Sequence, residues 1–195
     1  MFTGIIQDIG TVRALEGGNR VVRIGTRLPL GDVVLGASIA CSGVCLTVVR
    51  KTESDFTAEL SPETLAKTTA ATWTVGGQLN LERPLRLGDE LGGHLVLGHV
   101  DGCCEMHARH EDGPNAVCVF QTPPDLARFL APKGSVVLDG ISLTLVEADR
   151  DHFSVALIPH TLSVTTASTW APGRRVNLEV DVLARYVDRL LTKAL

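Results

Sequence analysis

The chain has 195 residues, 45% of them hydrophobic, enough to bury one large core or two small cores of roughly 90 residues each. A formal net charge of −4 and a pI near 5.8 supply no basic field for a phosphate backbone, which argues against nucleic acid as a partner. The opening MFTGIIQDIG lacks a basic start, and no stretch approaches the ~20 apolar residues that a membrane crossing needs. We therefore expect a soluble, cytoplasmic protein without a membrane partner. Its five cysteines, an odd number without an export signal, favour reduced thiols over disulfides.

An internal repeat divides the chain. SGVCLTV (42–48) returns as DGISLTL (139–145), 97 positions later. Three further pairs follow the same order: FTGIIQD (2–8) with VLGHVDG (96–102), ELSPETLAKTT (59–69) with ALIPHTLSVTT (156–166), and LNLE (79–82) with VNLE (176–179). The first of these pairs is 94 positions apart and the others 97, so the second copy has three extra residues, which we place in the surface stretch 109–115. Two copies of this length indicate duplicated globular domains.

The elements predicted along the chain are mostly strands. Residues 46–62 alternate as a hairpin and lead into a short helical turn at 62–67; a second turn is predicted at 124–130, a second hairpin at 141–159 and a strand at 174–180. Within the tail, residues 182–191 place apolar side chains on one helical face. The pattern predicts an all-β protein of two tandem barrels followed by one C-terminal amphipathic helix.

The sequence lacks the motifs that are typical of several kinds of functional site. Neither a phosphate-binding loop nor a dinucleotide fingerprint occurs. The cysteines and histidines that could suggest a zinc site are Cys41, Cys45, Cys103, Cys104, His94 and His99. Neither C-x-x-C nor H-E-x-x-H occurs, so we expect no metal and interpret the four thiols as buried small side chains. Cys103 and Cys104 are adjacent on a strand, which predicts one side chain inside and one outside.

Six ordered blocks carry a family resemblance over the whole length: MFTGII, SGVCLTV, GGHLVLGHVDG, DGISLTL, IPHTL and VNLEVD. Together they resemble the riboflavin synthase family of lumazine-binding-repeat proteins. The resemblance implies two duplicated six-stranded Greek-key barrels, at 1–88 and 89–182, and a trimerisation helix at 183–195. It also implies a homotrimer that binds two molecules of 6,7-dimethyl-8-ribityllumazine and transfers a four-carbon unit between them, yielding riboflavin, with no cofactor.

The resemblance also implies two substrate pockets, one in each barrel. The first would use Gly4, Ile5, Ile6, Ser38, Ser42, Cys45, Leu46, Thr47, Leu60, Glu63 and Thr64. The second would use Gly98, His99, Val100, Lys133, Ser142, Leu143, Thr144, Ile158, Pro159 and Thr161. Among these and their neighbours, the catalytic candidates are Cys45, His99, Lys133, Ser142 and Asp181.

Structural roles remain open for several of these residues. Thr47 and Thr144 suit a hairpin simply as strand formers, and His99 suits a structural histidine. Glu82 and Glu179 occupy matching places after an asparagine, where both fit partners of turn amides. Asp181 differs, because its counterpart is Pro84, and a charge found in only one copy is harder to explain as scaffold.

Three classes of function remain: the enzyme, a non-catalytic lumazine or flavin carrier of the same superfamily, and a duplicated β-barrel interaction module. A carrier would need only one pocket, whereas both motif sets are present here. An interaction module leaves the matched pocket residues unexplained. His160 stands opposite Glu63, so the two pockets would hold a ribityl chain differently.

Overall fold

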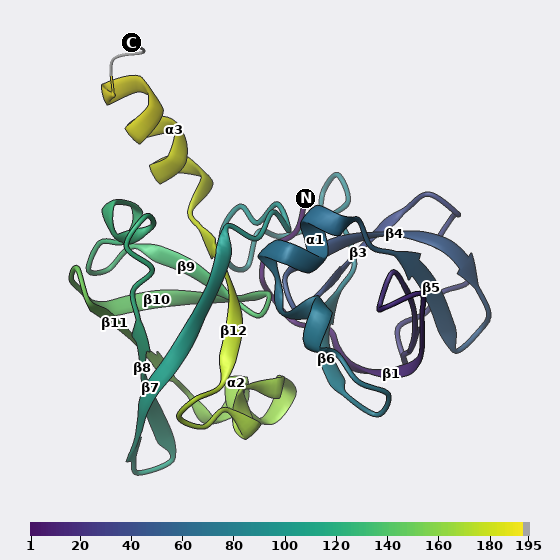
Figure 1. Ribbon diagram of the computed structural model, residues 1–195, viewed down its shortest axis with the longest axis horizontal. Helices are drawn as coiled ribbons and strands as arrows, with labels where there is room; N and C mark the ends of the chain where they lie inside the picture. The colour runs from purple at the N-terminus through teal and green to yellow at the C-terminus, as the bar shows by residue number, and fades with distance from the viewer. Residues whose placement is uncertain (193–195) are drawn as a thin grey trace.

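Two closed antiparallel barrels lie side by side in the computed structural model, which describes residues 1–192, and one helix projects from the second barrel (Figure 1). The first barrel contains β1 (Asp8–Glu16), β2 (Val21–Gly25), β3 (Ser38–Cys41), β4 (Val44–Lys51), β5 (Asp55–Glu59) and β6 (Gln78–Glu82). The second contains β7 (Gly102–Asp112), β8 (Asn115–Gln121), β9 (Ser135–Leu138), β10 (Ile141–Ala148), β11 (His152–Leu157) and β12 (Arg175–Val180). Both close in the same order, β1-β2-β5-β4-β3-β6 and its equivalent, which confirms the predicted duplication.

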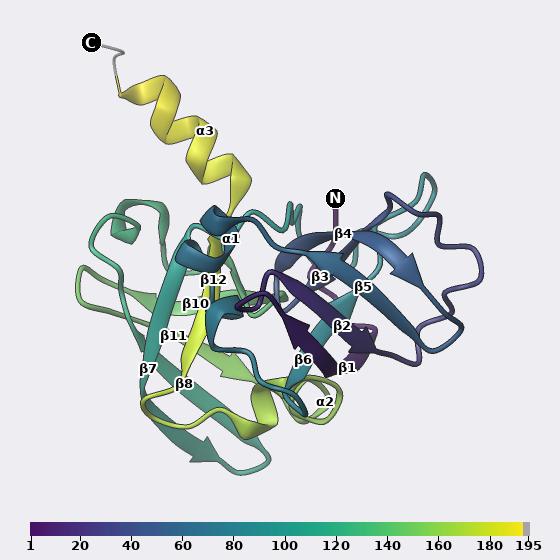
Figure 2. The same ribbon diagram turned by 45° about the vertical axis from the view of Figure 1, so that its right-hand side comes forward.

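Helical segments are short except at the C-terminus. The turn expected at 62–67 is α1 (Pro62–Lys67), and the one expected at 124–130 contains η2 (Ala127–Phe129). The segments without a prediction are η1 (Thr69–Thr72), α2 (Pro159–Val164) and η3 (Thr166–Thr169). The tail forms α3 (Val182–Leu191), which points away from both barrels in Figures 1 and 2. The last three residues of the predicted 183–195 helix lie outside the described residues.

Each barrel encloses its own core because alternate side chains of its strands face inward. Along β4, Val44, Leu46 and Val48 are buried, while Thr47 between them is exposed. Two separate clusters of buried side chains fill the two barrels. Cys104 is buried and Cys103 half-buried, as predicted, and all five cysteines are free thiols.

The barrels contact each other through a reciprocal pair of buried asparagines. Asn80 of β6 donates from Nδ2 to the Asp139 carbonyl (2.8 Å) and accepts at Oδ1 from the Thr166 amide (2.8 Å). These bonds satisfy polar groups that burial between the barrels would otherwise leave unpaired. The equivalent bonds from β12 run from Asn177 Nδ2 to the Ser42 carbonyl (2.7 Å) and from the Thr69 amide to Asn177 Oδ1 (2.7 Å).

The three extra residues of the second copy are not all where we predicted them. The β1–β2 hairpin pairs Glu16 with Val21, and the β7–β8 hairpin pairs His110 with Val117, so two extra residues lie in the longer hairpin. Equivalent residues are 96 positions apart in β2 and β8 but 97 positions apart in β3 and β9. The third extra residue therefore lies between β8 and β9. Both places are surface connections, which tolerate insertions. In the part of the chain that the structure describes, no helix is long and apolar enough to cross a membrane.

Candidate active site

A short segment before β1, here called the first strap (residues 3–6), is held by a buried carboxylate. Glu82, at the end of β6, accepts hydrogen bonds from the amides of Thr3 (2.7 Å) and Gly4 (2.9 Å) and from the Thr3 hydroxyl (2.8 Å). The strap then reaches the second barrel, where the Ser142 amide of β10 donates to the Gly4 carbonyl (2.8 Å). Gly4 has φ +76°, and a Cβ there would lie 2.6 Å from the Ser142 Cβ, so this approach requires glycine.

A second strap (residues 97–100) makes the reciprocal arrangement before β7. Glu179, near the end of β12, accepts from the amides of Leu97 (2.8 Å) and Gly98 (2.9 Å). The Cys45 amide of β4 donates to the Gly98 carbonyl (3.0 Å), and a Cβ on Gly98 would lie 2.6 Å from the Cys45 Cβ. Glu82 and Glu179 therefore bind turn amides, the structural role that their matched positions suggested.

The two straps are exchanged between the barrels, which corrects the predicted grouping of pocket residues. Ile6 packs against the core cluster of the second barrel, and Val100 against that of the first. The straps meet where the amide of Phe2 donates to the Val96 carbonyl (2.7 Å) and the amide of Val96 to the Phe2 carbonyl (3.1 Å). The first strap, with Gly4 and Ile5, thus belongs with Ser142, and the second, with Gly98 and His99, belongs with Cys45.

His94 contacts Ser142, and sequence reasoning did not place it in the site. Its Nδ1 lies 2.7 Å from the Ser142 Oγ, while Nε2 is buried without a hydrogen-bond partner among the described residues. Burial lowers the pKa of His94, and the negative charge of Asp181 opposes that shift. The imidazole is therefore neutral at pH 7 and able to exchange a proton with the serine. Gly93 completes the enclosure, because a Cβ there would lie 2.8 Å from the Ser142 Cβ.

Cys45 has a simpler environment. Its side chain is half-buried, and its thiol makes no hydrogen bond with the described residues. His99, which we predicted beside Ser142, is exposed in the strap over Cys45. Thr47 is exposed on the same face of β4, and Ser38 pairs with it across the sheet, so these two residues lie beside Cys45 as a group. Thr144 occupies the equivalent exposed place near Ser142.

Two further candidate residues, Lys133 and Asp181, have no polar counterpart in the first copy. Asp181 is the N-cap of α3, where its Oδ1 accepts from the Leu183 amide (2.9 Å). Lys133 is exposed at φ +68°, a left-handed conformation that is strained for a lysine, and its amide donates to the Leu145 carbonyl (2.9 Å). Its counterpart in the first copy is Gly36, at φ +88°.

Four predicted binding residues have side chains that are buried elsewhere. Leu46, Leu60 and Leu143 belong to the barrel cores, because the strand period turns them inward, so only their backbones can face a ligand outside. Ser42 is also buried, in the turn between β3 and β4, where its Oγ accepts from the Asn80 amide (3.2 Å). The Ser42 side chain is therefore bonded to β6, and substrate binding by Ser42 stays a prediction.

The remaining predicted residues lie on the two short helices after β5 and β11. Ser61 caps α1 by accepting from the Thr64 amide (3.0 Å), and Glu63 is exposed in its first turn. In α2, Ile158 is the cap residue and provides no side-chain hydrogen bond. The cap residue is therefore polar in the first copy (Ser61) and apolar in the second (Ile158), and two positions later the first copy has an acid, Glu63, where the second has His160.

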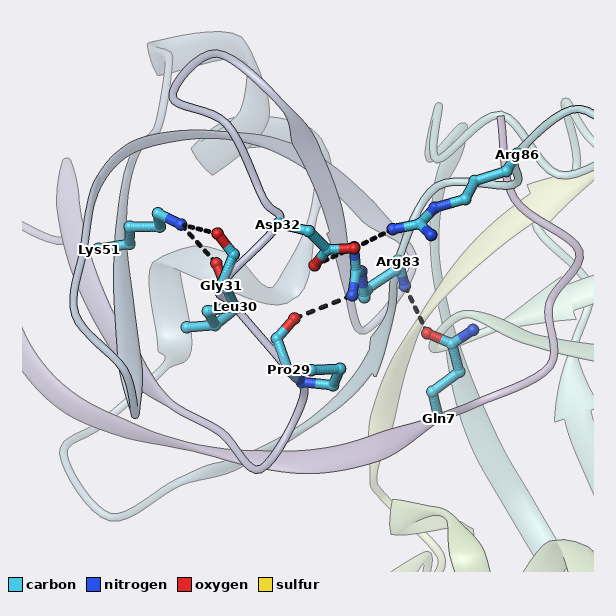
Figure 3. Close-up of polar contacts among 8 residues, drawn as sticks. All are labelled: Gln7, Pro29, Leu30, Gly31, Asp32, Lys51, Arg83 and Arg86. Atoms are coloured by element: carbon cyan, nitrogen blue, oxygen red, sulfur yellow. Dashed lines mark hydrogen bonds and ion pairs between the residues drawn. The ribbon is translucent and has the colours of Figure 1, made fainter.

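The linker between β6 and β7 carries His94, and hydrogen bonds and ion pairs hold the first residues of this linker against the first barrel (Figure 3). Arg83 donates through its guanidinium to the Pro29 carbonyl (2.9 Å) and pairs with Asp32 (2.8 Å), and its amide donates to Gln7 Oε1 (2.9 Å). Arg86 also pairs with Asp32, and hydrogen bonds from the two arginines hold the pKa of this carboxyl far below its usual range. The linker therefore leaves the first barrel in a fixed direction.

Within residues 1–192, no group of three or more His, Cys, Asp or Glu side chains lies close enough to hold a metal ion. The candidate residues carry a thiol, a hydroxyl, an imidazole, a carboxylate and an ammonium group. This donor set suits proton transfer and nucleophilic addition.

Proteins that are similar to the chain in sequence share the name riboflavin synthase. The chain is 48% identical over 197 residues to riboflavin synthase of Brucella abortus, covering 97% of this chain and 98% of that one. It is 44% identical over 200 residues to riboflavin synthase of Mycobacterium tuberculosis, covering both chains fully. A crystal structure of LumP complexed with riboflavin superimposes with a TM-score of 0.81 at 26% identity, covering 92% of this chain and 99% of LumP.

The family model for the lumazine binding domain matches twice, at residues 3–84 and 97–181. Each match begins at or beside a strap and ends just after a strap-binding glutamate, so it spans one barrel with its strap. The chain therefore belongs to the lumazine binding domain family.

Proposed function

We propose that the protein is a riboflavin synthase, which converts two molecules of 6,7-dimethyl-8-ribityllumazine into riboflavin and 5-amino-6-ribitylaminouracil. Four carbons pass from one molecule to the other without net oxidation, so no redox cofactor is required. One observation carries the proposal: two matched clusters, one around Cys45 and one around Ser142, lie under exchanged glycine straps. A reaction between two identical molecules needs two similar binding sites with different chemistry.

The Ser142 cluster suits proton transfer. The substrate must lose a proton from a ring methyl group, and a neutral imidazole hydrogen-bonded to a hydroxyl can relay that proton. Ser142 and His94 supply this pair, and the carboxylate of Asp181 favours the protonated imidazole as it forms. We assign Lys133 to the same substrate molecule, because a strained lysine at a position where glycine suffices indicates a functional constraint.

The Cys45 cluster suits addition to an electrophilic ring. A thiol is strongly nucleophilic through even a small thiolate fraction, and Cys45 is half-buried with no competing hydrogen bond among the described residues. Backbone groups of the second strap and the exposed face of β4 would bind the pyrimidinedione edge. Glu63 and Thr64, on α1, would bind the ribityl chain.

We infer a homotrimer assembled through α3. Its base is fixed by ion pairs, Arg185 to Asp101 (3.0 Å) and Arg128 to Asp188 (3.4 Å), yet its apolar face is unburied. The apolar side chains exposed over more than half their area are Leu183 (63%), Tyr186 (62%), Val187 (54%), Leu190 (84%) and Leu191 (78%). Packing this face against other copies would bring a Cys45 cluster of one subunit to a Ser142 cluster of the next.

The direct test is to mix the purified protein with the lumazine and follow riboflavin absorbance. We expect one riboflavin and one pyrimidinedione for every two lumazines consumed. A carrier would bind the lumazine without product, and this outcome would refute the enzyme.

Deleting residues 183–195 should give monomers by light scattering that bind ligand but scarcely turn over. A truncated chain that stays trimeric and fully active would refute the assembly.

A further inference from the structure

A cavity of about 640 Å³ lies between the two barrels, outside the clusters described above. Neither Cys45 nor Ser142 lines it. Its walls are built largely from residues that the duplication relates, 97 positions apart. The related pairs are Ser42 and Asp139, Thr69 and Thr166, Thr72 and Thr169, Gly76 and Gly173, Gly77 and Arg174, and Gln78 and Arg175.

All the charged groups of this cavity come from the second copy. Arg174 and Arg175 stand where the first copy has Gly77 and Gln78. The backbone is the same in both: the Val12 amide donates to the Gly77 carbonyl (2.9 Å), and the Met106 amide to the Arg174 carbonyl (2.8 Å). The turn therefore forms without an arginine, and the two guanidinium groups are not needed by the scaffold.

Asp139 also has one more oxygen atom than its hydrogen bond to the scaffold requires. Its Oδ1 accepts from the Asn177 amide (2.8 Å), just as the Ser42 hydroxyl accepts from the Asn80 amide (3.2 Å). A serine thus suffices for this bond, whereas Asp139 has a second oxygen that accepts no hydrogen bond from the described residues. Asp139 is only 2% exposed, and burying a carboxylate that has a single hydrogen bond is costly. Burial raises the pKa of Asp139 to about 7, and the charge of Arg174 works against that rise.

Thr166 adds an unpartnered polar atom to the same cavity. The residue is 3% exposed, and its Oγ1 has no hydrogen-bond partner among the described residues. Because buried hydroxyl groups in folded proteins are almost always paired, this one is available to a ligand hydroxyl or a water that enters the cavity. The cavity is thus lined by two cations, a carboxyl group, an unpartnered hydroxyl and several neutral threonines.

We propose that this cavity is a second small-molecule site, which binds a phosphorylated sugar or polyol. Arg174 and Arg175 bind the phosphate, since guanidinium groups match its oxygens in charge and geometry. A ligand hydroxyl donates to the free oxygen of Asp139, and the Thr166 hydroxyl bonds a second one. A volume of about 640 Å³ suits a ligand of this size, and small-molecule sites are frequent between domains.

The first measurement is isothermal titration of the full-length protein with ribose 5-phosphate, with inorganic phosphate and ribose as comparison ligands. We expect one saturable site per chain for ribose 5-phosphate, and at least about tenfold weaker binding of either part alone. Trp73 lines the cavity, so its fluorescence should report the same binding curve. Failure of ribose 5-phosphate to saturate, or equally tight binding of inorganic phosphate or ribose, would overturn the proposal.

The variants substitute the residues of the first copy, which the same backbone already accommodates. The double variant R174G/R175Q and the single variant D139S should each weaken ribose 5-phosphate binding at least about tenfold. Arg150→Gln, at an arginine that does not line the cavity, is the matched control and should leave ribose 5-phosphate binding unchanged. Riboflavin affinity, measured on every variant, verifies the fold and should equal that of the wild type. Wild-type sugar phosphate binding in R174G/R175Q would place the ligand elsewhere and refute the site.

Discussion

The clusters around Cys45 and Ser142 share one scaffold and differ in chemistry. In both, a glutamate at the end of the last strand holds a strap whose glycine lies against the other barrel. The Ser142 hydroxyl has a histidine, His94, within hydrogen-bond distance, whereas His99 in the strap over Cys45 is exposed. The duplication therefore preserved what positions a ligand, while the side chains that act on it diverged.

The largest effect should come from the glycines shared by both clusters. Gly98→Ala should lower the free energy of unfolding by about 2–5 kcal/mol, since a Cβ would lie 2.6 Å from the Cys45 Cβ and φ is +75°. Gly4→Ala should cost about as much. Gly76→Ala is the control: φ is +88° with no atom within 4 Å, so it should cost only about 1–2 kcal/mol. Urea unfolding measures all three, and equal losses at Gly98 and Gly76 would rule out the close approach.

The next largest effect is a pH dependence of the free energy of unfolding, which Asp139 causes and its counterpart Ser42 does not. The folded pKa of Asp139 is raised from 3.8 to about 7, so the wild type loses stability as pH rises through this range. From pH 4 to pH 8, the free energy of unfolding of Asp139→Ser relative to that of the wild type should therefore rise by up to about 4 kcal/mol. Denaturant titrations at several pH values measure this. A pH-independent difference would mean that Asp139 does not titrate in this range.

Exchanging the two central residues tests whether the chemical difference matters. Cys45→Ser and Ser142→Cys nearly conserve volume, so melting temperatures should change little. Each should lower turnover by more than about tenfold, or roughly 1.4 kcal/mol in the barrier, and Asp181→Asn should do likewise. Pro84→Asp is the matched control and should not create a second competent site. Near-wild-type turnover in both exchanged variants would show that thiol and hydroxyl are interchangeable.

The smallest effect concerns Lys133 and Gly36. Lys133→Gly removes a left-handed lysine and should raise the free energy of unfolding by about 1 kcal/mol, while turnover falls. Gly36→Lys should lose about as much stability and bring no gain in activity. Thermal melts and steady-state kinetics on both variants decide the point. Unchanged turnover in Lys133→Gly would remove this lysine from the site.

Local patterns were sufficient to predict the barrels and the C-terminal helix, and the matched positions of the two glutamates suggested a structural role. Alternation along β4 puts Cys45 and Thr47 on the face that points away from the core, so the interpretation of Cys45 as a buried thiol was only partly right. The same period turns Leu46 and Leu143 inward, yet family likeness had grouped them with the ligand-facing residues. The repeat located both members of each matched pair, because duplicated residues keep their spacing.

Only the tertiary structure decided which strap covers which barrel. The repeat is equally compatible with each strap lying on its own barrel or on the other, since both choices preserve spacing and periodicity. The exchange depends on contacts between distant segments, such as Gly4 with Ser142 and Gly98 with Cys45. His94 was missed for a related reason: its contact with Ser142 spans 48 residues of chain. Spacing within a sequence records local geometry, whereas a site between two folded units is formed by how they pack.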